Sequence, residues 1–256
     1  MAVQRGTRRS SSDRAADNKS SATESSRKVG VGRWAWEWTK SIVIAFSLFL
    51  VIRTFLVEAF RIPTGSMEKT LLVGDFLLVN KAVYGAQLPL TKKHLPAFKN
   101  PQRGDVVVFI PPHEPDKNYV KRLIGVPGDT LEMRNKQLIR NGQSQPEPYV
   151  QHTDPSNDVY APSMYWQCEY RPVRLKDADC RPTRDNWGPV VVPAGHFMML
   201  GDNRDDSEDS RYWGFVDRNA VKGKPLFIYY SFDSSTLRPF PWITEIRWKR
   251  IGHTID

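Results

Sequence analysis

A serine within Pro63–Asp75 has the residue type and the setting of a nucleophile. Ser66 follows Gly65 and lies shortly after a long apolar run. A serine hydroxyl attacks a carbonyl when a neighbouring base removes its proton. Gly-Ser pairs more often mark turns, and Thr64 and Glu68 stand where the α/β-hydrolase turn has its two glycines. The sequence therefore excludes that turn and leaves Ser66 as a candidate.

Lys121 is a candidate base. In the strand-like stretch that begins at Tyr119, alternation places Tyr119, Lys121 and Leu123 on one face. If that face is buried, the ammonium loses water and its pKa falls, so that the neutral amine becomes available as a base at roughly pH 7–8. The alternative is a solvated lysine on an edge strand, the usual position of a strand lysine. The pattern alone leaves both readings open.

The stretch Gly201–Gly214 gathers five acidic residues and two arginines. A calcium loop is the main competitor, but an EF-hand that began at Asp202 would have Arg204 at an oxygen-ligand position and Ser207 at the glycine position. No cysteines and histidines have zinc-site spacing. We predict no metal and no cofactor, and the structural alternative for this stretch is a turn held by Asp–Arg pairs.

The five histidines do not mark the base of a Ser-His-Asp triad, although the sequence does not exclude one; they are His94, His113, His152, His196 and His253. A serine with a lysine base needs neither a histidine nor a metal.

The elements that must position these residues are predicted to be β-strands. Nineteen prolines and sixteen glycines argue against a helical bundle. Strands do not alternate with long amphipathic helices, which argues against a parallel α/β sheet. We therefore expect a mainly β fold with antiparallel strands. Short runs of apolar, β-branched and aromatic residues cover Phe76–Lys81, Asp105–Ile110, Tyr119–Gly125, Phe197–Leu200 and Leu226–Ser231.

The N-terminal part differs in composition. Residues 1–28 contain seven serines and seven Lys or Arg, which predicts a disordered tail. Residues 41–57 are mostly apolar and carry a single charge, Arg53. Three tryptophans precede them, as at a membrane interface: Trp34, Trp36 and Trp38.

We predict a cytoplasmic tail over 1–33 and one transmembrane helix over 34–58, with a buried or amphipathic helix as the alternative. The basic residues before the helix place the N-terminus in the cytoplasm and all that follows residue 60 outside it.

The net charge of +9 does not describe a basic domain. Residues 1–60 hold ten basic and five acidic side chains, whereas the other 196 residues hold 27 and 23. A nucleic-acid-binding protein needs a basic patch on a folded unit, so that class loses its support.

Both cysteines lie in a polar, proline-bearing stretch, 141–190, that resembles an insertion. Cys168 and Cys180 have eleven residues between them. An oxidising compartment would favour a disulfide, and two free thiols are the alternative.

Taken in order after the apolar segment, these motifs resemble those of bacterial type I signal peptidases, the leader peptidases. The resemblance covers most of 55–131 and 197–216, and four matches in register make it specific. They are GSMEKTLLVGD with the serine, RGDVVVF, YVKRLIGVPGD with the lysine, and GDNRDDSEDSRYWGFV with the acidic residues.

The resemblance implies a membrane-bound serine endopeptidase that removes signal peptides from exported preproteins, cutting after small residues in Ala-x-Ala patterns. It implies that Ser66 is the nucleophile and Lys121 the general base. Thr64 would supply an oxyanion-hole hydroxyl beside the Ser66 N–H. Ser207 would orient Lys121, and the supporting residues would be Asp209 and Arg211 as an ion pair, with Asp202 and Arg204 nearby.

The substrate pockets implied by the resemblance are lined by Phe60, Ile62, Met67, Leu71, Tyr119 and Val120. The implied fold is a catalytic β-domain over 59–131 and 191–256 with a smaller β cap over 132–190 that carries both cysteines. The expected location is the cytoplasmic membrane, crossed once, with the catalytic domain on the periplasmic or extracytoplasmic face. The expected partners are preprotein signal peptides, membrane lipids and the secretion machinery, and no nucleic acid.

Lys69 departs from the family, which commonly has a proline three residues after the nucleophile. The lysine is a minor rival of Lys121 for the role of base.

Two other functions share parts of the pattern. A self-cleaving Ser/Lys repressor would need an N-terminal pair of DNA-binding helices, which residues 1–60 do not resemble. A membrane-tethered β-domain that only binds exported chains would have no reason to retain the five residues Ser66, Lys121, Ser207, Asp209 and Arg211.

Overall fold

A computed structural model describes residues 31–88, 91, 93–155, 158, 160–175 and 179–255. The predicted tail, 1–33, lies largely outside the described residues, which begin at Val31.

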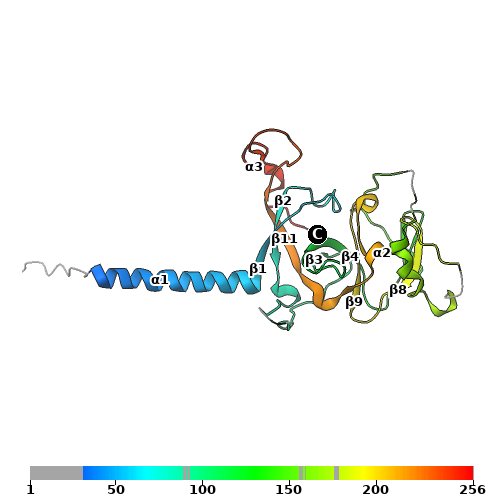
Figure 1. The fold of residues 1–256 in the computed structure, drawn as a ribbon, viewed down its shortest axis with the longest axis horizontal. Helices are drawn as coiled ribbons and strands as arrows, with labels where there is room; N and C mark the ends of the chain where they lie inside the picture. Colours follow the sequence, from blue (N-terminus) through cyan, green and yellow to red (C-terminus); the bar gives the residue numbers. More distant parts are fainter. Residues whose placement is uncertain are drawn as a thin grey trace, which may run out of the picture. The chain divides into compact units, whose positions relative to one another are not determined.

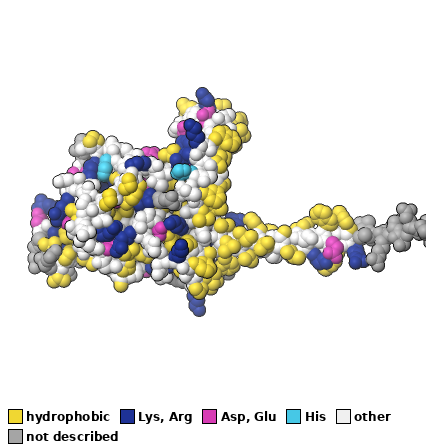
Figure 2. Space-filling view, turned by 180° about the vertical axis from the view of Figure 1, so that it is seen from behind, with side chains coloured by type: hydrophobic (Ala, Val, Ile, Leu, Met, Phe, Trp, Pro, Cys, Tyr) yellow, Lys and Arg dark blue, Asp and Glu magenta, His cyan; other side chains and the backbone are white. Residues whose placement is uncertain are grey.

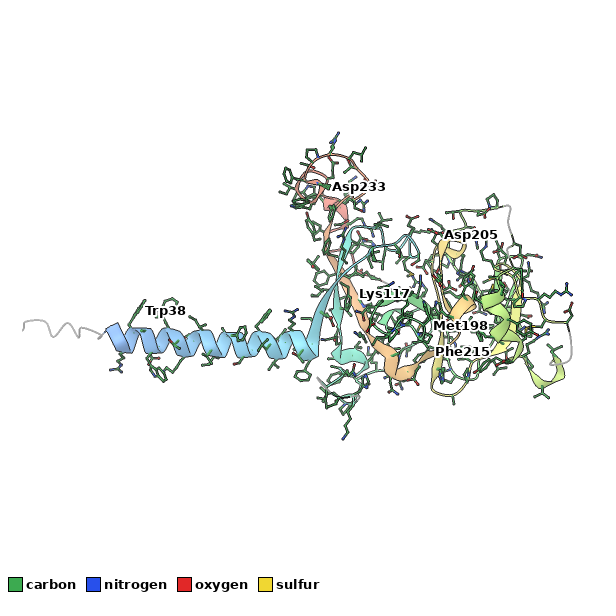
Figure 3. All side chains as sticks on the ribbon, in the orientation of Figure 1. Trp38, Lys117, Met198, Asp205, Phe215 and Asp233 are labelled. Carbon is green, nitrogen blue, oxygen red and sulfur yellow. A yellow bond between two sulfur atoms is a disulfide. The ribbon has the colours of Figure 1, made fainter. Side chains whose placement is uncertain are left out.

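The chain begins with a long apolar helix. Helix α1 spans Val31–Val51 and continues as a π-helical turn, η1, over Ile52–Leu56. Helical residues 32–56 are long and apolar enough to cross a membrane. Figure 2 shows hydrophobic side chains over most of the surface of this helix, and Trp38, labelled in Figure 3, is among its exposed tryptophans.

The bounds of this helix differ from the predicted 34–58. It includes residues 31–33, which we had assigned to the tail, and it ends at Leu56. Val57 already pairs with Asn80 and Glu58 with Val79 in a β-ladder. Backbone pairing with the sheet therefore ends the helix before its apolar sequence is exhausted.

The body of the protein, from Phe49 onward, is a compact unit built on antiparallel sheets (Figure 1). The larger sheet has seven strands in the spatial order β1-β2-β11-β3-β4-β9-β10. In chain order these are β1 Val57–Arg61, β2 Asp75–Asn80, β3 Val106–Phe109, β4 Tyr119–Gly125, β9 His196–Leu200, β10 Val216–Asp217 and β11 Val221–Ser231. This confirms the predicted mainly β, antiparallel fold.

The second sheet has four strands in the order β7-β6-β5-β8. We call it the cap sheet; its strands are β5 Thr130–Arg134, β6 Gln137–Arg140, β7 Gln143–Ser144 and β8 Trp187–Val191. The cap sheet therefore extends from Thr130 to Val191, slightly beyond the range 132–190 that was predicted for the cap at both ends. The apolar runs of the sequence mark neither these four strands nor β1 and β10.

The two sheets share a hydrophobic cluster. Ile124, Met198 and Leu200 of the large sheet lie in one buried cluster with Leu131 and Trp187 of the cap sheet. Phe215 packs against this cluster, near Met198 (Figure 3). This continuous core couples the cap sheet to the strands that carry the candidate residues.

Both faces of the large sheet are covered, which explains its apolar strand sequences. In β3, Val106 and Val108 belong to one buried cluster, whereas Val107 and Phe109 belong to another. A strand buried on both faces has a continuous apolar run rather than alternation.

Short helical turns connect the strands. They are η2 Ala82–Tyr84, η3 Pro162–Cys168, η4 Val173–Leu175, η5 Arg204–Asp206, α2 Ser210–Trp213, η6 Arg218–Ala220, α3 Pro241–Thr244 and η7 Trp248–Arg250.

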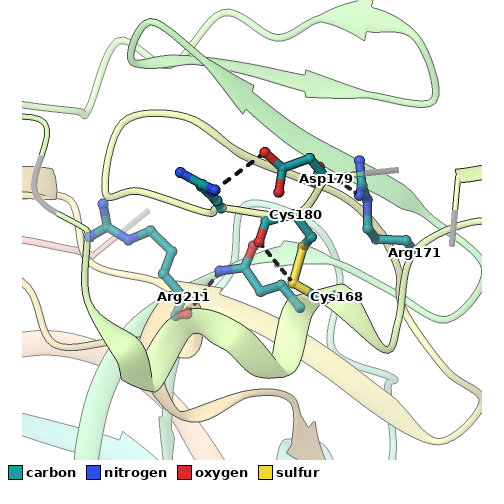
Figure 4. The surroundings of a disulfide bond; sticks show 7 residues. Cys168, Arg171, Asp179, Cys180 and Arg211 are labelled. Carbon is teal, nitrogen blue, oxygen red and sulfur yellow. Dashed lines mark hydrogen bonds and ion pairs between the residues drawn. A yellow bond between two sulfur atoms is a disulfide. The ribbon is translucent and has the colours of Figure 1, made fainter. Parts of the chain in front are cut away.

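A disulfide joins Cys168, the last residue of η3, to Cys180, with their Cα atoms 5.8 Å apart (Figure 4). The same turn, η3, contacts the acidic stretch Gly201–Gly214. Trp166 Nε1 and Gln167 Nε2 both donate to the Arg211 carbonyl, at 3.1 and 2.9 Å. The bridge therefore restrains a segment that contacts the candidate site.

We expect replacement of both cysteines (Cys168→Ser with Cys180→Ser) to lower the free energy of unfolding by about 2–3 kcal/mol. The cross-link restricts the unfolded chain, and loops of this length give stabilisation of that order. Denaturant unfolding of the full chain in detergent would measure the change, and a reducing agent should destabilise only the parent protein. An equal unfolding midpoint for the parent and the double variant would contradict the prediction.

Candidate active site

A cleft of about 850 Å³ in the body brings together the candidate residues from the three sequence stretches. Ser66, Lys121 and Ser207 all line it, as does Thr64. Lys117 and Asp205, both labelled in Figure 3, also belong to its wall. Ser66 and Ser207, which are 141 positions apart in the chain, therefore meet in one cavity.

Ser66 lies in the loop between β1 and β2. The base of this loop is closed by two backbone hydrogen bonds, from Ile62 N to Asp75 O at 2.8 Å and from Gly74 N to Ile62 O at 3.0 Å. Within it, Leu71 N donates to Met67 O at 2.7 Å. Two antiparallel strands thus present a short, internally bonded loop that carries the serine to the cleft.

Lys121 lies on β4, between β3 and β9, so it is not on an edge strand. Its side chain is only 3% exposed, and its Nζ donates a hydrogen bond to Ser207 Oγ at 3.1 Å. Loss of water on burial lowers the pKa of Lys121 to about 8, against the opposing influence of the Asp209 carboxylate. The solvated-lysine alternative is excluded.

The Ser207 hydroxyl is directed by a buried ion pair. It donates to Asp209 Oδ2 at 2.8 Å, and Arg211 binds both carboxylate oxygens, with Nε at 2.8 Å and Nη2 at 2.9 Å. Burial alone would raise the pKa of Asp209, but the charge and hydrogen bonds of Arg211 outweigh it and the pKa lies below its usual range. Asp209 therefore stays ionised, and the Ser207 oxygen is left to accept from Lys121.

Asp202 and Arg204 also lie in buried pairs, but not with each other. Arg122 donates to both oxygens of Asp202, at 2.9 and 2.8 Å, and Thr70 Oγ1 donates to Oδ2. Arg204 forms a two-pronged pair with Glu147 of the cap segment. Asp202 thus links the Ser66 loop to β4, because Thr70 and Arg122 share it.

Gly201 is required where the Ser66 loop meets the acidic loop. An added Cβ would overlap both the Ser207 hydroxyl and the Ser66 carbonyl oxygen. The Ser66 carbonyl also accepts a hydrogen bond from Asn203 N at 3.1 Å. Only a residue without a side chain lets the two loops approach this closely.

Most of the predicted substrate-contacting residues line the cleft: Phe60, Ile62, Met67, Tyr119 and Val120. Leu71 does not; it is fully buried in the core beneath, in a cluster with Leu77 and Val79. Leu71 follows one turn after Met67 in the bonded loop, so its side chain enters the core.

Lys69 points away from the cleft. Its Nζ donates to the carbonyls of Pro148 and Val150, at 2.5 and 3.0 Å, and it is absent from the cleft wall. Its φ of +79° is also unavailable to a proline, which is locked near −65°. The structure therefore gives Lys69 no position as a base.

Sequence reasoning missed Arg122 and Glu147 as members of the site. Alternation along β4 places Arg122 on the same face as Val120 and Ile124, which is an apolar pattern. A cation on a buried apolar face needs a carboxylate partner, so this pattern could have indicated Arg122. Glu147 lies in the polar insertion, and nothing in its neighbourhood marked it.

Among the described residues, no group of three or more His, Cys, Asp or Glu side chains could hold a metal ion. Without a metal, the arrangement can hold the desolvated amine of Lys121 in the same open cleft as the hydroxyl of Ser66.

Comparison with known proteins gives consistent matches over most of the chain. The family described as signal peptidase, peptidase S26, matches residues 35–230. A signal peptidase I from Pseudomonas aeruginosa is 41% identical over 226 residues, which cover 82% of this chain and 78% of that protein. A signal peptidase I from Aquifex aeolicus is 34% identical over 242 residues, covering 78% and 87%.

A solved structure of a signal peptidase I from Enterococcus faecalis is 32% identical, with a TM-score of 0.33, and covers 49% of this chain and 97% of that one.

We expect Lys121 to titrate near pH 8, well below the ordinary value for a lysine side chain, and Glu208→Gln to lower its pKa further. Glu208 is exposed next to Ser207, and its negative charge raises the pKa of Lys121, after the larger influences of burial, Asp209 and Arg211. NMR of ¹³C-labelled lysine in the full chain would follow the titration, assigned with a Lys121→Met variant. Glu132→Gln, in the cap sheet, is the control; an unchanged or raised pKa in Glu208→Gln would contradict the assignment of charges.

Proposed function

Because the chain belongs to the peptidase S26 family of signal peptidases, and is thus a serine peptidase, we propose that Ser66 and Lys121 are its nucleophile and general base. The observation that carries this proposal is the burial of Lys121, which is 3% exposed and hydrogen-bonded to Ser207 in the cleft that Ser66 also lines. The substrates are exported preproteins, from which the enzyme removes the signal peptide.

In the first chemical step, Ser66 Oγ attacks the scissile carbonyl and its proton passes to Lys121 Nζ. The C–N bond of the substrate then breaks, and Lys121 returns the proton to the leaving amine. A neutral Lys121 has two N–H groups and one lone pair. Its hydrogen bond to Ser207 uses an N–H and leaves the lone pair for the serine proton.

Hydrolysis of the acyl-enzyme repeats the sequence with water as the nucleophile. A pKa of about 8 leaves an appreciable neutral fraction of Lys121 near neutral pH, whereas an ordinary lysine would be almost fully protonated.

The oxyanion of the tetrahedral intermediate needs two donors, and we assign these to the Ser66 N–H and the Thr64 hydroxyl. Thr64 is exposed in the cleft wall two residues before the nucleophile, so its hydroxyl is free to turn towards a bound carbonyl. Loss of one such donor costs on the order of 10²–10³ in rate.

The cleft wall favours small side chains at alternate substrate positions. An extended peptide directs every second side chain to the same side. Here that side is formed by apolar residues on the Ser66 side of the cleft, Phe60, Ile62 and Met67, with Tyr119 and Val120 of β4. We propose that alanine-sized residues one and three positions before the cut fit against this wall, as in Ala-x-Ala sequences.

The apolar helix would anchor the enzyme to the membrane. The basic residues that precede it favour an N-terminus in the cytoplasm, which places the body on the extracytoplasmic face. A disulfide between Cys168 and Cys180 suits that oxidising side. Membrane lipids and the secretion machinery are then natural neighbours, because the substrate's signal peptide is itself in the membrane.

The decisive experiment is incubation of the detergent-solubilised full chain with a preprotein whose signal peptide ends in Ala-x-Ala, followed by mass spectrometry. We expect a single cut after the final alanine, and none with Ser66→Ala, since the nucleophile is missing. A preprotein left intact by both proteins, or cut equally by both, would refute the proposal.

We also expect Gly201→Ala to lower kcat by about 10²-fold or more, because the added methyl group displaces both Ser207 and the Ser66 carbonyl and small misplacements are costly in catalysis. Gly223→Ala is the matched control, since its Cβ would overlap the Asn80 carbonyl oxygen between β11 and β2 and cost stability at a distance from the cleft. Comparable kcat values for the two variants, compared below their unfolding temperatures, would show that the effect is only one of stability.

A further inference from the structure

Lys69 has an unusual backbone and an unusual attachment. It is an exposed residue whose backbone φ is +79°. This lies in the left-handed region, which residues other than glycine rarely adopt. Its Nζ gives two of its three N–H groups to the carbonyls of Pro148 and Val150. An exposed lysine normally remains solvated and mobile, so this arrangement persists only where the surroundings hold it.

The carbonyls that Lys69 binds belong to the segment 147–151, which leads out of the cap sheet. Neither carbonyl belongs to a helix or a strand. The lysine therefore satisfies two backbone acceptors that the segment itself leaves open.

The same segment is attached to the acidic loop. Gln151 N donates to Asp202 O at 2.9 Å, and Arg204 N donates to Gln151 O at 3.1 Å. The Glu147 carboxylate accepts hydrogen bonds from both Nη1 and Nη2 of Arg204. Segment 147–151 thus lies between the loop that carries Ser66 and the loop that carries Ser207, and is bonded to each.

We propose that Lys69 is a positioning residue, which fastens the Ser66 loop to segment 147–151 and so fixes the nucleophile relative to the base and its support. This proposal rests on the proposed function of Ser66. On its other side the loop is held by Asn203 N, bonded to Ser66 O. Other hydrogen bonds hold the loop as well, from Thr70 Oγ1 to Asp202 and from Asn203 Nδ2 to Gly65 O. Lys69 adds two bonds to segment 147–151, three residues after the nucleophile.

The Lys69 ammonium is held by backbone carbonyls, so its removal leaves no buried charge and creates no cavity. Loss of the side chain should therefore loosen the loop at this point, while its bonds to Asp202 and Asn203 remain and the body stays folded. The expected consequence is a less frequent alignment of Ser66 with Lys121, which lowers kcat, while the apolar wall that binds substrate stays in place.

The test compares Lys69→Met, Lys69→Gly and Lys69→Arg in the full chain, with preprotein cleavage and hydrogen exchange as readouts. Methionine keeps the length but removes the donors; glycine also removes them but relieves the positive φ. We expect both variants to lower kcat by roughly 10- to 100-fold with KM within about twofold, and arginine, which keeps donors, to recover most of the rate.

Hydrogen exchange gives a readout that does not depend on the proposed chemistry. Amides in 63–72 and 147–151 should exchange faster in Lys69→Met and Lys69→Gly, with an unchanged thermal midpoint. Lys81→Met is the matched control, because Lys81 Nζ also binds a backbone carbonyl, that of Arg53, and does not line the cleft.

The outcomes separate the two proposals. Parent-like kcat and exchange in Lys69→Met would overturn the positioning role and leave the proposed function intact. Complete loss of turnover in Lys69→Met together with parent-like exchange would also overturn it, because that result would make Lys69 a chemical participant. If the parent protein cleaves no preprotein, the proposed function fails, and the exchange data still decide whether Lys69 fastens the loop.

Discussion

A lysine that has lost its water is stable only if its surroundings offer a partner, yet a close anionic partner would restore the proton that catalysis must remove. Lys121 lies between these limits. Burial lowers its pKa, Asp209 raises it, and Arg211 lowers it again, which leaves a pKa of about 8. The carboxylate is not in direct contact with the amine, because the Ser207 hydroxyl stands between them. Much of the body can be understood as a means of maintaining this balance.

The balance requires that both sides of β4 be covered. Neighbours β3 and β9 remove Lys121 from any sheet edge, and apolar clusters cover both faces of the sheet. The insertion that carries the cap sheet participates directly through its helical turn η3, since Trp166 and Gln167 donate to the carbonyl of Arg211, the residue that keeps Asp209 ionised. A cap that only shielded the cleft would not need these hydrogen bonds.

The parts of this arrangement that follow from local patterns could be predicted from the sequence. Apolar runs located β2, β3, β4, β9 and most of β11, and alternation within β4 placed Lys121 on a face with Leu123, which is buried. Four motifs then indicated the family.

The parts that depend on tertiary pairing could not be predicted. Val57 leaves an apolar helix to pair with Asn80, and Leu71 turns into the core although its type suits a pocket wall. In the cap sheet, β5, β6 and β7 are short and have no apolar run to mark them, and β8 contains a glycine and a proline before its valines. Asp202 and Arg204 are two residues apart in the sequence, but each is paired with a distant residue, Arg122 and Glu147 respectively.

A serine with a lysine base places stronger demands on a fold than a serine with a histidine. Histidine titrates near neutral pH in water, whereas lysine does so only after desolvation. The site must therefore be dry at the amine and open at the serine within one cleft. In this protein the amine belongs to a central strand and the serine to a loop beyond the sheet. Met67 and Leu71 anchor this loop in the core. Between these anchors and β1, the position of Ser66 depends on contacts with neighbouring loops. The close approach at Gly201, the Asn203 bond to Ser66 O and the attachment of Lys69 to segment 147–151 supply these restraints. The dryness of Lys121 and the restraint of Ser66 are thus two separate requirements, met by the sheets and by the loops, and catalysis depends on both at once.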